Sequence, residues 1–282
     1  MAEIEQFLEW LACPVCGGDL SRTDDGLGCP EGHSFDIAKQ GYANLLGPQG
    51  RTHTADRPEM LDARTRVLGA GLFDPLTEAI REILVGFDWS ETRGPVVDLG
   101  TGTGFHLERA LEELPDMLGL GLDNSKYAAR RAARCHPRAA AAVADVWEGL
   151  PLKDASVALL LDVFAPRNGP EIRRVLGPGG VAIVVTGAPE HLAGIPEGFG
   201  MITVDPEKQE RLARTMEELD RKGDSVEIEW TMSLTPDEVA DLVRMGPGAG
   251  RVEPEAFAVE VEALPDRTEV LGRAELHLFT VT

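Results

Sequence analysis

Short apolar runs that end at an acidic residue recur along the middle of the chain. They cover residues 96–99, 117–122, 139–144 and 157–161, and an acid lies within or directly after each of them. Continuous apolar runs of this length, separated by helical patterns, are typical of parallel strands that are buried on both faces. The pattern therefore predicts an α/β domain with a Rossmann-like sheet whose strand ends carry polar side chains along one edge.

Helical periodicity and later strands complete this outline. Apolar positions recur at helical spacing around residues 74–85 and 107–114, and Thr235-Pro-Asp-Glu238 is a helix-start signature. Further strands are expected at residues 181–186, 226–234 and 274–281, the first of them after a turn at Leu176-Gly-Pro-Gly-Gly180. The last of these runs is expected to be the final strand of the sheet.

A glycine-rich loop follows the first predicted strand. Asp98-Leu-Gly100-Thr-Gly102-Thr-Gly104 joins that strand to an amphipathic helix, and glycine lets the backbone approach a ligand closely. The glycines are spaced Gly-x-Gly-x-Gly and not Gly-x-Gly-x-x-Gly. This spacing favours S-adenosylmethionine as the cofactor and leaves a nicotinamide dinucleotide as the alternative.

Acids at the next strand ends fit the same cofactor. Asp123 lies twenty-three positions after Gly100, where a carboxylate can accept both ribose hydroxyls. Asp145 ends the third strand and is suited to the adenine amino group. The sequence therefore predicts a cofactor site that includes Asp98, Gly100, Gly102, Gly104, Asp123 and Asp145.

The N-terminal residues carry the spacing of a metal site. Cys13 and Cys16 form one knuckle, twelve residues separate Cys16 from Cys29, and three separate Cys29 from His33. Three thiolates and one imidazole make a closed tetrahedral Zn²⁺ site of the structural type. A redox pair at Cys13 and Cys16 is the alternative, but it does not explain the third cysteine and the histidine at finger spacing.

Charge limits the class of partner. The 282-residue chain has a net charge of −21 and a pI near 4.6, which argues against extended, non-specific RNA binding but not against a local basic face. No run approaches the ~18 apolar residues of a membrane span, and no basic segment precedes an apolar one at the N-terminus. A cytoplasmic location is expected.

Two sets of basic residues could form such a local face. One follows the second strand at roughly helical spacing, and the other lies between the metal module and the sheet. The second set is the better candidate for an RNA contact because of its place between two domains. The sets are Arg130, Arg131, Arg134 and Arg138, and Arg51, His53, Arg57, Arg64 and Arg66.

With these motifs, the chain resembles the RlmA/TlrB family of 23S rRNA guanine-N1 methyltransferases over nearly its whole length. The metal-ligand set and the following segment His33–Leu46 are the most specific part of the resemblance. It continues through Met60–Arg64, Gly71–Leu76, the glycine loop, Ala144–Trp147, Val163–Arg167, Glu171–Leu176 and Glu190–Leu192.

The resemblance implies further roles. Phe73, Gly104, Phe105 and His191 match family positions that contact the cofactor. It also implies a hairpin of 23S rRNA as substrate, a contribution to macrolide resistance and a homodimer.

The chemistry of N1 methylation adds two candidates. Guanine N1 carries a proton at neutral pH, and Asp162 at the end of the fourth strand is the nearest carboxylate that could accept it, although it could also simply line the cofactor. Phe164 and Pro166 could form an apolar wall against a flat substrate, or close the sheet edge.

The expected organisation is a zinc-binding module (1–50), a helical linker (51–90) and a methyltransferase domain (91–282). The sequence predicts an S-adenosylmethionine-dependent methyltransferase that most resembles the guanine-N1 rRNA enzymes. A methyltransferase of small natural products on the same scaffold is the alternative.

Overall fold

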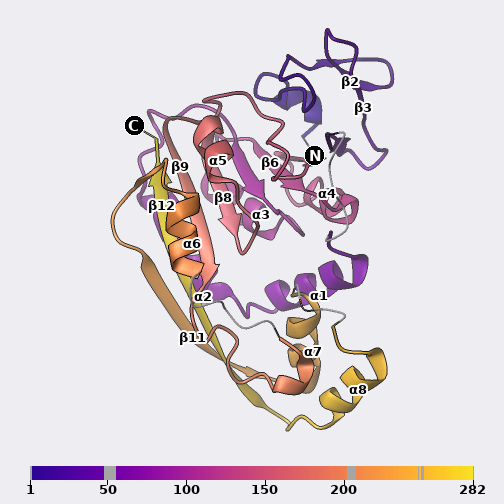
Figure 1. Ribbon diagram of the computed structural model, residues 1–282, viewed down its shortest axis with the longest axis vertical. Coiled ribbons are helices and arrows are strands. Elements are labelled where there is room, and N and C mark those ends of the chain that lie inside the picture. The colour runs from indigo at the N-terminus through magenta and orange to yellow at the C-terminus, as the bar shows by residue number, and fades with distance from the viewer. Residues whose placement is uncertain (1, 48–54, 202–207, 247, 249–250, 282) are drawn as a thin grey trace.

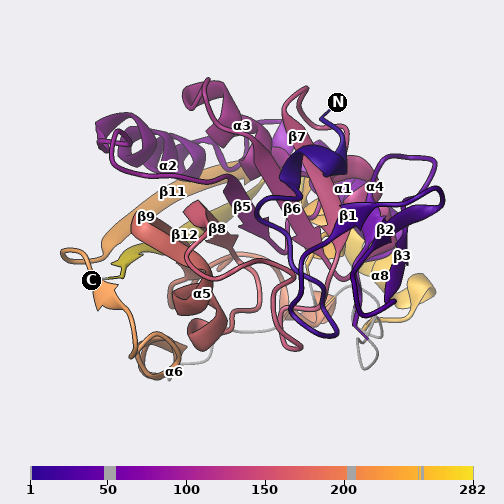
Figure 2. The ribbon, with the colours of Figure 1, turned by 90° about the horizontal axis from the view of Figure 1, so that it is seen from above.

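The computed structural model describes residues 2–47, 55–201, 208–246, 248 and 251–281 (Figure 1). Arg51 and His53 of the second basic set therefore lie outside the described residues. A mixed sheet runs through the molecule, helices cover both of its faces, and a small ribbon-like module lies at one corner (Figures 1 and 2).

The sheet has the strand order β10-β12-β9-β8-β5-β6-β7-β4, and β11 also pairs with β12. Its central strands are parallel, and β12 runs antiparallel between β9 and β11. The order reverses at β5, where the glycine loop begins, and open parallel sheets bind ligands at such a point. The strands are β4 (Ala43–Asn44), β5 (Val96–Leu99), β6 (Gly119–Asp123), β7 (Ala139–Val143), β8 (Val157–Val163), β9 (Leu176–Gly187), β10 (Asp220–Arg221), β11 (Val226–Leu234) and β12 (Thr268–Thr280).

Each face of the sheet has its own hydrophobic core. Val97, Leu99 and Leu160 pack with α5, α6 and the N-terminal module, whereas Val96 and Leu159 pack with α2, α3 and α7. Alternation of side chains along buried strands explains this division. The helices are α1 (Pro58–Gly69), α2 (Asp74–Gly86), α3 (Phe105–Glu113), α4 (Lys126–Ala132), α5 (Gly169–Val175), α6 (Lys208–Thr215), α7 (Pro236–Arg244) and α8 (Pro254–Glu262), with 3₁₀ turns η1 (Ile4–Phe7) and η2 (Glu197–Phe199).

The N-terminal module joins the main sheet. Its own three-stranded sheet consists of β1 (Ser21–Arg22), β2 (Gly26–Gly28) and β3 (Ser34–Asp36). The next strand, β4, pairs in parallel with β7 at the outer edge of the large sheet. Phe7 and Leu11 are fully buried in the same core as the central strands. The module is therefore anchored on the catalytic domain through apolar contacts as well as strand pairing.

Two strands differ from the expected bounds. Strand β9 begins at Leu176 and not at residue 181, because Val157 pairs with Leu176 and Leu159 already pairs with Val181. The expected glycine-rich turn is thus an irregularity inside the strand. Strand β12 begins at residue 268 instead of 274, because its first half pairs with β11 and its second half with β9.

The two helices of the predicted linker pack into the catalytic domain. Helix α1 lies against α7, and α2 lies against α3 and β11. Within the part of the chain that the structure describes, no helix is long and apolar enough to cross a bilayer.

Candidate cofactor site and zinc centre

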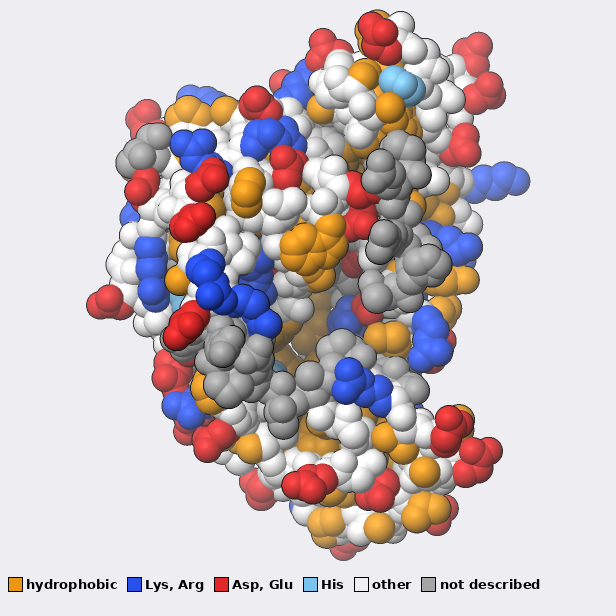
Figure 3. Space-filling view, in the orientation of Figure 1, with side chains coloured by type: hydrophobic (Ala, Val, Ile, Leu, Met, Phe, Trp, Pro, Cys, Tyr) orange, Lys and Arg blue, Asp and Glu red, His pale blue; other side chains and the backbone are white. Residues whose placement is uncertain are grey.

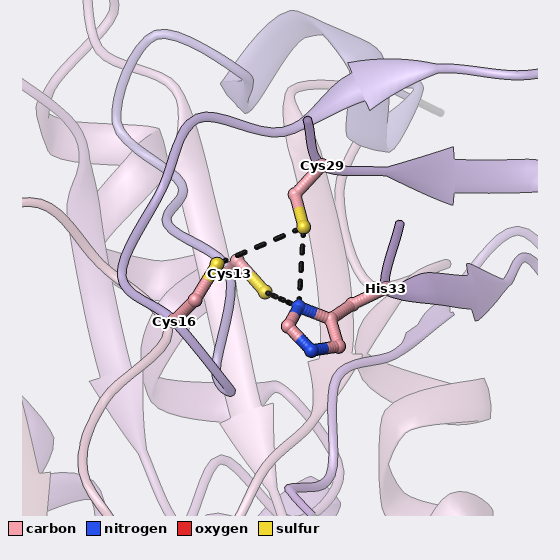
Figure 4. A group of neighbouring side chains, drawn as sticks. All are labelled: Cys13, Cys16, Cys29 and His33. Carbon is pink, nitrogen blue, oxygen red and sulfur yellow. Dashed lines mark hydrogen bonds between the residues drawn. The ribbon is translucent and has the colours of Figure 1, made fainter. Parts of the chain in front are cut away.

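The four predicted metal ligands converge on one point (Figure 4). Their ligand atoms all lie within 4.8 Å of one another. Cys13 and Cys16 come from the turn after η1, and the β2–β3 hairpin brings Cys29 and His33 to face them. Cys13 is buried, and the other three ligands are more exposed.

The distances within the cluster fit a tetrahedral zinc ion. The Cys16 and Cys29 sulfurs are 3.7 Å apart, and His33 Nδ1 lies 3.3 Å and 3.6 Å from the sulfurs of Cys29 and Cys13. Tetrahedral Zn²⁺ with Zn–S near 2.3 Å and Zn–N near 2.0 Å places its ligands about 3.5–3.8 Å apart. These residues would therefore hold a structural zinc ion, and among the described residues they form a complete set of four ligands, as closed structural sites have.

The glycine loop has the backbone that its sequence requires. Gly100, Gly102 and Gly104 all adopt positive φ angles, of 61°, 55° and 83°. A Cβ atom at Gly100 would lie 2.7 Å from Ala165 Cβ, and one at Gly104 would lie 2.8 Å from Cys135 Cβ. Larger residues would therefore be strained and would collide with the segments beside the loop.

The buried side chain of Asp98 stabilises this loop through a hydrogen bond. Its carboxylate is 2% exposed and accepts a hydrogen bond of 2.6 Å from the Thr101 hydroxyl. Burial, with the nearby charges of Asp123 and Asp162, raises the pKa of Asp98 to about 7. Asp98 lies beneath the loop, so its hydrogen bond with Thr101 fixes the backbone that faces the ligand.

Asp123 and Asp145 lie at the same edge of the sheet. Asp123 accepts hydrogen bonds from the Gly102 and Ser125 backbone amides, at 2.9 and 2.8 Å, and burial raises its pKa to about 6 despite those bonds. Asp145 accepts from the Trp147 amide at 3.0 Å. Both carboxylates are 8% exposed, and they lie at or just after the ends of the neighbouring parallel strands β6 and β7.

Arg64 lies beside the glycine loop, a position that the sequence does not predict. It was expected on an RNA-binding linker, but its Nη1 atom lies 2.6 Å from the position of a Cβ on Gly102. Asp56 binds Nη1 at 2.5 Å, and Nη2 donates to the Met245 carbonyl at 2.9 Å. The guanidinium therefore covers the glycine loop with further donors available. Its sequence neighbours gave no signal of this position, because α7 helps to set it.

An aromatic cluster lies beside the loop. Phe73 packs edge-to-face on Phe164, His191 and Trp230, and the rings of Phe164 and His191 stack at 5.3 Å. Phe164 is 40% exposed, whereas Phe73 is buried. His191 is fixed by the Arg273 amide, which donates to its Nδ1 at 3.0 Å. The structure thus brings two of the residues implied by the resemblance together, and adds Trp230 of β11.

Strained backbone is concentrated around this stacked pair. Among the described residues, four that are not glycine have positive φ, and three of them are Phe164, Glu190 and Leu192. Such conformations cost of order 1–3 kcal/mol each and persist where the surroundings enforce them, often at functional sites. Phe164 and His191 are therefore held in place by the fold. Phe105 lies at the start of α3, half-buried, with Arg109 over its ring.

Asp162 is fully buried. Its side chain has no exposed surface, and Arg167 Nε lies 3.6 Å from its Oδ1. A base must reach the proton that it removes. In this conformation the carboxylate is covered, so its role as a base stays a prediction.

The structure separates the two basic sets. Described members of the linker set pair with acids: Arg57 with Glu59, Arg64 with Asp56, and Arg66 with Asp241. In the other set, Arg131 pairs with Asp62, and Arg138 donates to the carbonyls of Leu111, Leu114 and Met117. Arg130 and Arg134 remain exposed.

Comparison with known proteins agrees with this arrangement. The family model described as the N-terminal zinc ribbon of RlmA matches residues 11–52. A 23S rRNA (guanine(748)-N(1))-methyltransferase of Streptomyces fradiae is 43% identical over 93% of this chain and 94% of its own length. A Micromonospora griseorubida protein, provisionally named a 23S rRNA (guanine-N(1)-)-methyltransferase, is 45% identical over 95% of this chain and 96% of its own length.

A solved phosphoethanolamine N-methyltransferase from Haemonchus contortus has a TM-score of 0.49 and 14% identity, covering 93% of this chain and 70% of its own. That similarity is too low to inform the substrate. Full-length similarity to the two guanine-N1 enzymes, the zinc ribbon and the intact glycine loop agree with one another. The chain is an S-adenosylmethionine-dependent methyltransferase, and it belongs to the family of 23S rRNA guanine-N1 methyltransferases.

Proposed function

We propose that this enzyme methylates N1 of a guanine in a hairpin loop of 23S rRNA. The observation that supports this most is the 43% identity to the Streptomyces fradiae enzyme over 93% of the chain, because it spans the zinc ribbon and the cofactor domain alike. The alternative of a small natural product as substrate finds no support among these relatives.

The chemistry is a displacement at carbon. When bound, S-adenosylmethionine would supply a methyl carbon activated by its positive sulfur. Transfer of that methyl group to guanine N1 would release S-adenosylhomocysteine, and the N1 proton would pass to solvent or to a nearby base. Alignment of the nucleophile with the methyl carbon is the main task of the protein, and positioning lowers such barriers by several kcal/mol.

The cofactor would lie along the edge formed by the glycine loop and the ends of β6 and β7. Asp123 would accept the ribose hydroxyls, and Asp145 the adenine amino group. Arg64 would bind the carboxylate of the methionine part, since a guanidinium binds carboxylates through two parallel hydrogen bonds. Phe73 and His191 would then contact the cofactor from the aromatic cluster.

The target base would stack on Phe164. Its ring is 40% exposed at the end of β8, next to the glycine loop, and is supported from behind by His191. Enzymes that modify bases commonly hold an extruded base against such an aromatic wall. Asp162 would act as a base only if Arg167 moved aside. In its observed position it would instead hold Arg167 at the end of β8.

The experiment is methyl transfer from labelled cofactor to unmodified 23S rRNA, followed by reverse transcription. Methylation at guanine N1 blocks base pairing, so a single new stop is expected in a hairpin loop. RNA that stays unlabelled while the protein binds the cofactor would contradict the proposal. Phe164→Ala is expected to lower kcat/KM for RNA with unchanged cofactor affinity.

We propose three further properties together with this function. The protein would act in the cytoplasm, where its RNA substrate is found. Expression in a sensitive host would raise macrolide tolerance if the methylated guanine lies near the drug site. A homodimer is expected from the family resemblance, and light scattering of the purified protein tests it.

A further inference from the structure

Helix α4 carries an unusual concentration of positive charge. The chain has 48 acidic residues, yet none lies between Asp123 and Asp145. That interval contains Lys126, Arg130 and Arg134, which are all exposed. Lys126 and Arg130 are four apart on α4 and so lie on the same side of the helix, and Arg134 follows in the turn after Ala132. These three residues are called the stripe. The stripe repels itself, and no acid on α4 offsets the repulsion.

Positive side chains elsewhere in the molecule are mostly neutralised. Acidic and basic side chains alternate over the face shown in Figure 3, and most arginines with described side chains are in ion pairs or bind backbone carbonyls. Among the described side chains, seven Lys or Arg residues form neither a hydrogen bond nor an ion pair, and three of them belong to the stripe. The seven are Lys39, Lys126, Arg130, Arg134, Arg214, Lys222 and Arg251.

The opposite side of α4 fixes the orientation of the stripe. Ala128, Ala129 and Ala132 have no exposed surface, and the last two pack against Ala141 and Val143 of the sheet. Small alanines hold the helix close to the sheet, so its charged side can only face outward.

The start of the helix is fixed as well. The N-cap Ser125 binds the α4 amides and donates to the Asp56 carbonyl at 2.6 Å. Tyr127, which follows within the first turn and is 41% exposed, adds an aromatic ring to the outer surface of α4. The stripe and this ring are therefore presented to solvent by a well-anchored helix.

The stripe lies between the cofactor edge and the zinc ribbon. Helix α4 begins shortly after Asp123, and Tyr42 and Leu46, on either side of β4, pack against its alanine cluster. Both ribbon views place α4 beside the N-terminal module (Figures 1 and 2). Lys39, exposed and without an ion pair, precedes Tyr42 in the same turn.

We propose that Lys126, Arg130 and Arg134, with Tyr127, form the surface that holds the phosphate backbone of the RNA substrate. The inference rests on the proposed function. Three cations without ion pairs, of which Lys126 lies 5.3 Å from the centroid of the exposed Tyr127 ring, match the charge of RNA and the stacking that unpaired bases offer. Its place explains how a chain of net charge −21 binds RNA: one acid-free helix faces the backbone while the target guanine enters the neighbouring cofactor edge.

The test removes two charges from the stripe. Arg130→Gln/Arg134→Gln is compared with Arg81→Gln/Lys222→Gln, which removes the same charge from α2 and from the ring of Phe87 at its end. Helices α2 and α4 lie on opposite sides of the molecule (Figure 2). The substrate is unmodified 23S rRNA, and KM, kcat and cofactor affinity are measured over a range of salt concentrations. Thermal unfolding serves as the folding control, and no loss of stability is expected because repulsion within the stripe is relieved.

The stripe variant is expected to raise the KM for RNA about tenfold, with kcat and cofactor affinity unchanged. The slope of log KM against log salt should fall by about 0.7–0.9 for each phosphate that the variant no longer neutralises. The α2 control should match the wild type. If both variants changed the KM for RNA equally, or if neither changed it, the proposal would be overturned. The proposed function would still stand, because RNA would still be methylated. A wild type that methylates no RNA would instead overturn the proposed function, and this inference with it.

Discussion

The zinc ribbon and the cofactor edge are built in opposite ways. All four zinc ligands lie within twenty-one consecutive residues, and two short turns bring them together. The proposed cofactor edge combines Arg64 from α1, Gly102 after β5, Asp123 from β6 and His191 after β9. Local spacing is enough for the first site, whereas the second exists only when the sheet is assembled. The two sites should therefore respond differently to perturbation.

Removal of zinc should have the largest effect. Zinc binding contributes roughly 10–16 kcal/mol to the folding of isolated zinc fingers. Cys29→Ser or strong chelation is therefore expected to unfold residues 13–36, while the sheet keeps its fold and its cofactor affinity. Hydrogen exchange of the module and calorimetric titration of the cofactor measure the two responses. Simultaneous loss of both would show that module and sheet unfold as one unit.

Asp123→Ala should affect only the other site. Hydrogen bonds to a charged acceptor contribute about 1.5–3 kcal/mol each, so losing two to the ribose should weaken cofactor binding by roughly 100-fold or more. Zinc content should stay at one ion per chain. Calorimetry and metal analysis of the same preparation provide the comparison, with Asp116→Ala on the exposed surface as a control. Unchanged affinity would remove Asp123 from the site.

Arg64→Gln should separate two parts of the cofactor. Loss of a charge-assisted pair to the methionine carboxylate is expected to weaken S-adenosylmethionine binding about 10- to 50-fold. 5′-Methylthioadenosine lacks that carboxylate, so its affinity should not change. Arg66→Gln, on the same helix but paired with Asp241, is the matched control. Equal weakening of both ligands would mean that Arg64 supports the loop and does not bind the carboxylate.

Asp98→Asn should produce the smallest effect, visible only against pH. Burial raises the pKa of Asp98 to about 7 in the folded protein, above the value near 3.9 of an unfolded chain. The folded state therefore holds an extra proton between these values, and the contribution of Asp98 to stability falls as pH rises toward 7.

The asparagine does not titrate and can still accept from Thr101. The variant is expected to gain on the order of 1–2 kcal/mol relative to wild type as the pH rises from 5 to 6.5, measured by urea unfolding. A constant difference across that range would mean that Asp98 stays ionised in the folded protein.

The sequence by itself determined the chemistry of both sites in outline. Cys13, Cys16, Cys29 and His33 were identifiable because zinc geometry translates into fixed spacing over a short stretch. The order of strands 96–99 to 157–161 and the glycine loop were equally visible, because buried strands and tight turns restrict residue type. The expected roles of Asp123 and Asp145 depended on that order alone.

Only the tertiary structure decided how side chains far apart in sequence are used. Arg64 and Arg130 look alike in the sequence, yet α7 and Asp56 hold one over the glycine loop while the other faces solvent. Arg138 binds the end of α3, and Asp162 is covered beside Arg167. The strand bounds at Leu176 and Thr268 likewise depended on pairing partners. Charge and burial are set by neighbours from other elements, and a linear pattern does not contain them.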